Sequence, residues 1–198
     1  MTLENMNLSG HFLIAMPNMQ DPFFADSVTY ICTHNAEGAM GVMINRPTDM
    51  NMETLFEKIN IPLENNRLSN QPVLFGGPVQ TERGFVLHTI EPDANKDEWN
   101  SSLLVTDEIA LTTSKDILEA FAKGAGPQKM LLTLGYAGWT AGQLESEILQ
   151  NAWLSVRPKD KKVLTRLLYE TDFSEKHHAA IHLLGIDPSM LSDTAGHA

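Results

Sequence analysis

Charged and polar side chains beside glycine-rich segments are the residues of this 198-residue sequence that could bind a ligand or catalyse a reaction. Arg46 and Arg83 carry guanidinium groups, whose planar fork of N–H donors matches the oxygens of carboxylates and phosphates. His88 and Glu147 could exchange protons with a substrate if each had a partner nearby. We predict that these side chains converge on one cleft. Its candidate residues are Asn45, Arg46, Gly76, Gly77, Arg83, His88, Trp139, Gln143 and Glu147.

Two glycine-rich segments could offer backbone N–H groups to an anion. Gly76-Gly77-Pro78-Val79 lies between two predicted strands, where its amides could form an anion nest. A hairpin whose glycines adopt positive φ explains the same residues, and we favour the hairpin. The segment from Gly135 to Gly142 precedes a predicted helix, a common phosphate position. It lacks the lysine and the spacing of known phosphate-binding loops, so we favour tight strand–helix packing there.

Several candidate side chains also have structural explanations. Arg46 ends a buried strand and could pair with Glu145 or Glu147 rather than with an acidic ligand, and structural pairing is our prediction. Glu147 has no visible second carboxylate for acid–base catalysis. Trp139 is expected in the core or at its rim, although it could also stack on a ligand.

Neither a metal site nor a nucleophilic cysteine is predicted. His178 and His182 are four residues apart on the last predicted helix, a spacing that can hold a metal, but no third ligand lies nearby in the sequence. Cys32 and His34 are expected to share one face of a strand, and we interpret Cys32 as a buried, inert thiol. No cofactor is predicted.

The segment Lys129–Trp153 is the one around which the other elements are expected to pack. Met130–Leu134 has the length and apolarity of a buried strand, and a glycine-rich corner follows it. From Ala141 the pattern becomes helical, with one apolar and one polar ridge. The apolar ridge is Leu144, Ile148 and Ala152, and the polar ridge is Gln143, Glu147 and Asn151.

The remaining elements predict one mixed α+β domain over residues 1–198, with loose tails at 1–9 and 192–198. A helix is expected over Met52–Ile59 with Asn51 as its cap, and another after a capping box at Thr113–Asp116. The further predicted strands are His11–Met16, Ser27–His34, Ala39–Asn45, Val73–Phe75, Phe85–His88 and Leu103–Val105.

Composition restricts the class of partner. The net charge is −11 and the charged fraction 20%, which favours solubility and opposes binding to phosphate backbones. Basic residues cluster only at Arg157, Lys159, Lys161, Lys162 and Arg166, which we interpret as a solvated surface. One cysteine, no secretory signal and no apolar run of about 20 residues predict a cytoplasmic protein without a membrane segment.

Ordered motifs along nearly the whole chain resemble the AlgH/YqgE family. The matching segments include Gly10–Pro17, Asp21–Phe24, Gly38–Pro47, Gly76–Val79, Arg83–His88, Gly135–Trp139, Gly142–Glu145, Asn151–Trp153 and Leu184–Asp187. The resemblance implies a single α+β domain with a curved, mixed, largely antiparallel and barrel-like sheet flanked by helices. This bacterial family is often labelled a transcriptional regulator, and no reaction or cofactor is attached to it.

Three functional hypotheses follow. The leading one is a non-enzymatic regulatory protein that acts through a protein partner or a bound small molecule, because no complete catalytic set is visible. The alternative is an enzyme or sensor for an anionic small molecule, such as a nucleotide or another phosphate-bearing compound, at the glycine-rich cleft. Direct DNA binding follows from the family label alone, and the acidic composition opposes it. Whether the protein forms a homo-oligomer is left open.

Overall fold

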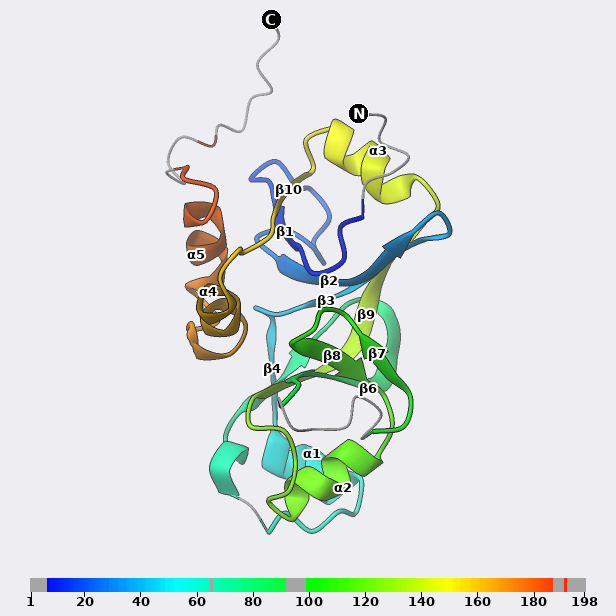
Figure 1. The fold of residues 1–198 in the computed structure, drawn as a ribbon, viewed down its shortest axis with the longest axis vertical. Helices are drawn as coiled ribbons and strands as arrows, with labels where there is room; N and C mark the ends of the chain where they lie inside the picture. Colours follow the sequence, from blue (N-terminus) through cyan, green and yellow to red (C-terminus); the bar gives the residue numbers. More distant parts are fainter. Residues whose placement is uncertain (1–6, 65, 92–98, 187–190, 192–198) are drawn as a thin grey trace, which may run out of the picture.

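Strand β9 (Met130–Thr140) is the centre of the computed structural model, which describes residues 7–64, 66–91, 99–186 and 191. β9 crosses from one half of the molecule to the other (Figure 1). Its first half pairs with β5 (Pro72–Phe75) and β6 (Val79–Thr89), and its second half pairs with β3 (Gly38–Met43). One strand therefore joins all parts of the sheet.

The sheet has ten strands in the described part of the chain. Its main path is β10-β1-β2-β3-β9-β6-β8-β7, with β4 attached through β5. The pairing of β5 with β9 is parallel, and the other pairs are antiparallel. The predicted α+β fold with a curved, largely antiparallel sheet is confirmed. The remaining strands are β1 (Phe12–Ala15), β2 (Val28–Asn35), β4 (Pro47–Asn51), β7 (Ser102–Leu104), β8 (Ile109–Thr112) and β10 (Trp153–Val156).

Short helices cover the sheet from three sides. Figure 1 shows α1 and α2 at one end of the molecule, α3 near the other end, and α4 and α5 along one side. The Asn51 side chain accepts a hydrogen bond from the Thr54 N–H, so the predicted cap of α1 is confirmed. The helices are α1 (Met52–Lys58), α2 (Asp116–Ala122), α3 (Gln143–Leu149), α4 (Lys161–Thr165) and α5 (Lys176–His182), with a 3-10 turn at Asn66–Leu68 and a π-helical turn at Arg166–Glu170. None of the described helices is long and apolar enough to cross a membrane.

Three apolar clusters correspond to these three groups of helices. One lies between β1, β2 and the α4–α5 region, a second lies under α1 and α2, and a third lies under α3. Helices therefore cover both faces of β1, and all four of its residues are buried. This explains why β1 is a continuous apolar run and does not alternate between apolar and polar residues.

The connection from β5 to β6 passes directly over β9 at Gly76 and Gly77, so the two strands do not form a hairpin. Both strands pair with Thr133 and Leu134, so they must lie on opposite edges of β9. A Cβ atom on Gly77 would lie 2.1 Å from the Tyr136 carbonyl carbon. The predicted hairpin is therefore wrong, because the glycines allow backbone to pack on backbone.

The predicted corner after Leu134 is also absent, since β9 continues through Gly135 and Gly138 to Thr140. Gly135 has φ of 73°, and a Cβ atom on it would lie 2.3 Å from the Gly77 carbonyl oxygen. Gly135 therefore allows another segment of backbone to approach β9 closely.

Four other predictions differ from the structure. Pro47 begins β4, just beyond the predicted end of the preceding strand at Asn45, and the four-residue strand β8 is not among the predicted strands. α2 has no side-chain cap; Asp116 instead accepts hydrogen bonds from Asn100. Leu8 is only 2% exposed, so residue 8 is packed and not part of a loose tail. Residues 1–6 and 192–198 lie outside the described residues.

The crossing predicts a large difference between two glycines. Gly135→Ala should lower the free energy of unfolding by about 3 kcal/mol or more, because a Cβ atom would clash with the Gly77 carbonyl and the positive φ is unfavourable. Gly84→Ala is the matched control, since a Cβ atom there would meet nothing within 4 Å. Chemical denaturation measures both, and equal stability of the two variants would contradict the crossing.

Candidate functional site

The nine predicted site residues do not line a single pocket. Arg83 and Trp139 border an open groove, whereas Asn45 and Arg46 border a separate pocket near α5. Gly76 and Gly77 lie in the crossing with β9, and the Gly76 N–H donates to the Leu134 carbonyl at 2.8 Å. That amide is therefore not available to an anion. The other three predicted residues are His88, Gln143 and Glu147, which engage in hydrogen bonds within the protein.

Glu147 on α3 binds two tryptophans at once. Its Oε2 atom accepts hydrogen bonds from Trp139 Nε1 and from Trp153 Nε1, both at 2.8 Å. Its Oε1 atom accepts from Gln143 Nε2 at 2.9 Å, and Gln143 Oε1 in turn accepts from the Thr140 N–H. Both indoles are almost fully buried. Gln143 and Glu147 of the predicted polar ridge thus form a structural clamp that fastens α3 to β9 and β10, whereas Asn151 lies beyond the end of α3.

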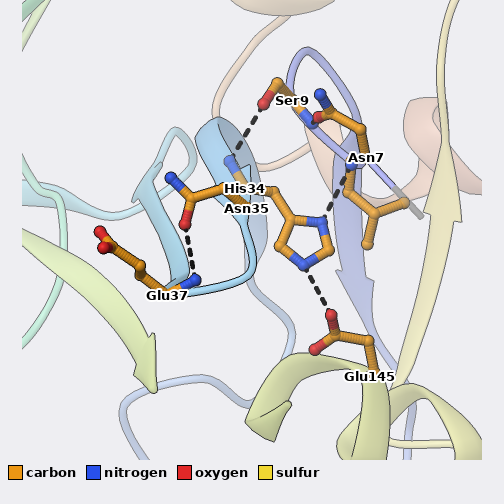
Figure 2. Close-up of polar contacts among 7 residues, drawn as sticks. Asn7, Ser9, His34, Asn35, Glu37 and Glu145 are labelled. Carbon is orange, nitrogen blue, oxygen red and sulfur yellow. Dashed lines mark hydrogen bonds and ion pairs between the residues drawn. The ribbon is translucent and has the colours of Figure 1, made fainter. Parts of the chain in front are cut away.

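His34 and Glu145 form a second polar contact on α3 that sequence reasoning missed. Figure 2 shows the His34 ring between Glu145 and the N-terminal segment. Nδ1 lies 3.0 Å from the Leu8 N–H, and Nε2 lies 2.9 Å from Glu145 Oε1. A backbone N–H can only donate, so Nδ1 accepts and Nε2 carries the hydrogen that Glu145 accepts. With both ring nitrogens engaged, His34 holds the chain near Leu8 in place and is not poised as a base.

A β-bulge explains why this contact was not predicted. Ile31 pairs with Gly41 and Thr33 pairs with Met40, so Cys32 is an extra residue in β2. The bulge reverses the alternation of side chains beyond it. Cys32 therefore packs in the cluster facing α4 and α5, while His34 reaches α3 on the other face. The expectation that Cys32 and His34 share one face is wrong.

Asn45 and Arg46 fix the loop before β2 and do not contact α3. Asn45 Oδ1 accepts from the Val28 N–H at 2.8 Å, and Asn45 Nδ2 donates to the Asp26 carbonyl. Arg46 Nη2 donates to the Ala25 carbonyl. The predicted pairing of Arg46 with Glu145 or Glu147 is wrong, because His34 and the two tryptophans engage those carboxylates.

His88 and Arg83 do not meet, because His88 is buried and Arg83 is exposed. His88 is 3% exposed, and its ring nitrogens lie 3.0 Å from the Thr89 carbonyl oxygen and 2.9 Å from Thr112 Oγ1. Burial lowers the pKa of His88 below its ordinary value. Arg83 is exposed; its Nη2 donates to Thr113 Oγ1 at 3.0 Å, and its guanidinium lies over the Phe85 ring.

Buried titratable groups elsewhere also have structural roles. Burial raises the pKa of the Cys32 thiol to about 12, which agrees with the prediction of an inert cysteine. The rings of His178 and His182 on α5 meet edge to face, and no group of three metal-binding side chains occurs among the described residues. Lys176, which sequence reasoning missed, is fully buried and donates to the Leu167 and Leu168 carbonyls. Burial lowers its pKa to about 7.

An open groove of about 750 Å³ lies between the β2–β3 hairpin, β9 and the β6–β8 region. Its apolar lining consists mainly of Met40, Val79, Phe85, Leu103, Leu111 and Tyr136. Glu37 and Arg83 supply one negative and one positive group at the same groove. Pockets of this size and polarity bind side chains or small molecules. No set of nucleophile, base and oxyanion donors lines it.

The whole chain is similar to proteins of one bacterial family. A family model described as AlgH-like matches residues 12–189. A UPF0301 protein of Azoarcus sp. (strain BH72) is 53% identical over 198 residues, which is 100% of both chains. The solution structure of the AlgH protein from Pseudomonas aeruginosa is 43% identical, has a TM-score of 0.75 and covers 100% of both chains. A crystal structure from Corynebacterium diphtheriae has 21% identity and a TM-score of 0.61 over 79% of each chain, which shows a shared fold.

The clamp on α3 predicts graded effects of substitutions at Glu147. Glu147→Ala should destabilise the protein by about 2–4 kcal/mol, because two buried indole donors lose their acceptor. Glu147→Gln should cost less, since its carbonyl can still accept from both indoles. Glu57→Ala on the exposed face of α1 is the control. Denaturation followed by tryptophan fluorescence checks the order, and a neutral Glu147→Ala would contradict the clamp.

The lowered pKa of His88 predicts loss of stability on acidification. The unfolded chain binds more protons at this site than the folded chain, so the free energy of unfolding falls as the pH drops below about 6.5. His88→Gln should lose less stability between pH 7.5 and 5.5 than the unmodified protein. His178→Gln, at an exposed position, should retain the full loss. The pKa of His11 is also lowered by burial, so some pH dependence remains in every variant.

Proposed function

The chain belongs to the AlgH-like family, whose function is uncharacterised, and we propose that it is a non-enzymatic regulatory protein that binds an extended segment of a partner protein in the groove beside β7. The observation that carries this proposal is the combination of an apolar groove with an edge strand. The groove has a volume of about 750 Å³, which accommodates several side chains of a bound segment.

Strand β7 supports an extended binding partner. It is at the end of the sheet, and among the described strands it pairs only with β8. An edge strand presents N–H and C=O groups that another strand can pair with. Leu103 and Leu104 on β7 are 37% and 47% exposed, and Val79 across the groove is 36% exposed. A partner strand that extends the sheet beside β7 would bury Leu103 and Val79, the two of these side chains that line the groove.

The state of the polar side chains favours binding over catalysis. Glu147, His34 and His88 are the groups best suited to proton transfer, and each is held by hydrogen bonds within the protein. A general base needs a free position within hydrogen-bond reach of a substrate. The net charge of −11 also argues against DNA as the partner. We therefore assign regulation to contacts with another protein.

Photo-crosslinking at the groove tests the proposal. A photoreactive residue in place of Leu103 should capture a discrete protein in cells, and the same residue in place of Leu149 on α3, which is 64% exposed, should not. With the captured partner purified, Leu103→Asp should weaken binding at least tenfold by calorimetry, because a carboxylate would have to be desolvated against apolar side chains. Leu149→Asp should bind normally.

Two results would overturn this function. One is identical crosslinking at Leu103 and Leu149, which would show that the groove is not selected by any partner. The other is unchanged affinity of Leu103→Asp protein for the captured partner. Turnover of a metabolite that disappears in Glu147→Gln protein would instead establish an enzyme.

A further inference from the structure

A second cavity, of about 510 Å³, lies where the start of β1, the end of β10, the β7–β8 turn and α4 meet. Gly10 precedes β1, Arg157 and Lys159 follow β10, and Thr106 lies in the turn between β7 and β8. Segments far apart in the sequence therefore build it. It includes part of the basic cluster at residues 157–166, which the sequence analysis interpreted as a solvated surface.

The charges in this cavity are unbalanced. Arg157, Lys159 and Lys161 contribute three positive charges and Glu108 one negative charge, which leaves two positive charges. Lys161 Nζ lies 3.5 Å from Glu108 Oε1, but neither Arg157 nor Lys159 has a hydrogen bond or ion pair in the described part of the chain. Like charges held together repel each other, and a bound anion would relieve that repulsion.

Tyr30 places an unsatisfied hydroxyl beneath the same cavity. The residue is 0% exposed, and its Oη atom has no hydrogen-bond partner. Thr106 lies beside it without a hydrogen bond of normal geometry, and burial raises the Tyr30 pKa well above its ordinary value. Buried hydroxyls are almost always paired with protein, water or ligand atoms. A ligand or water atom beside Tyr30 Oη would complete the hydrogen bonding of this hydroxyl.

Gly10 keeps the space between these groups open. It has φ of 77°, and the position of a Cβ atom on it would lie 3.8 Å from both Arg157 Nε and Tyr30 Oη. The same position would lie 2.9 Å from the Thr106 methyl group. A larger residue at position 10 would therefore crowd the Thr106 methyl group and fill the space between the Arg157 guanidinium and the Tyr30 hydroxyl.

We propose that this cavity binds the phosphate group of a small phosphorylated molecule. Arg157 offers a two-pronged donor to the phosphate oxygens, and Lys159 supplies the second charge that a phosphate dianion needs. The cavity is larger than one phosphate requires and leaves room for the rest of a metabolite. This site is separate from the groove beside β7, so each of the two proposals can be refuted without affecting the other.

Titration of the ¹⁵N-labelled protein with inorganic phosphate and with adenosine monophosphate at low salt tests the site. Both should give saturable shifts of the Gly10, Thr106 and Arg157 amide signals. Arg157→Gln combined with Lys159→Gln should weaken binding at least tenfold. Lys115→Gln combined with Lys123→Gln near α2 removes the same charge from exposed positions and should leave the affinity within twofold.

Tyr30→Phe tests whether the buried hydroxyl near Gly10 contributes to phosphate binding in addition to the charges of Arg157 and Lys159. Without phosphate the variant should be as stable as the unmodified protein or more so, because an unsatisfied buried hydroxyl is removed. Its affinity for phosphate should fall severalfold. Shifts that never saturate, equal losses in the two double variants, or equal affinity for citrate would overturn the proposal. Tight, strongly salt-dependent binding of duplex DNA in place of phosphate would also overturn it.

Discussion

Two segments of backbone cross in direct contact where Gly76 and Gly77 lie on Gly135 and Tyr136. Side chains cannot be accommodated there, since a Cβ atom on any of the three glycines would lie within 2.3 Å of another backbone atom. The contact is tied by hydrogen bonds from Met43 to the Gly76 carbonyl and from Gly76 to the Leu134 carbonyl. This crossing sends β5 and β6 to opposite edges of β9. The sheet therefore branches, and β9 has to serve both halves of the molecule.

The crossing also has consequences for the groove. After it, β6 pairs with β9 at Val79 and then only from Gly84, so the segment between them leaves the ladder. Arg83 and Gln80 in that segment line the groove together with Tyr136 and Trp139 of β9. The groove therefore lies where the pairing of β6 with β9 is irregular.

Two carboxylates on one helix illustrate how polar residues can have structural roles. Glu145 holds His34 and, through it, the backbone at Leu8, whereas Glu147 holds the two tryptophans. Buried indole and imidazole groups need such partners, because leaving them unpaired would cost about 1–3 kcal/mol each. The proposed binding surfaces lie elsewhere, and both involve the β7–β8 hairpin: β7 borders the groove, and the turn at Thr106 borders the basic cavity.

The sequence by itself determined the elements whose signals are local. Apolar runs specified β1, β2 and β3, Asn51 specified the start of α1, and ordered motifs specified the family. Only the tertiary structure decided which segments meet. The extra residue Cys32 in β2 turned His34 toward Glu145, the glycine crossing replaced an expected hairpin, and the proposed cleft residues were distributed over several sites. The physical reason is that strand pairing and side-chain direction depend on register across the sheet, and a single bulge or crossing changes the register without a distinctive local sequence signal.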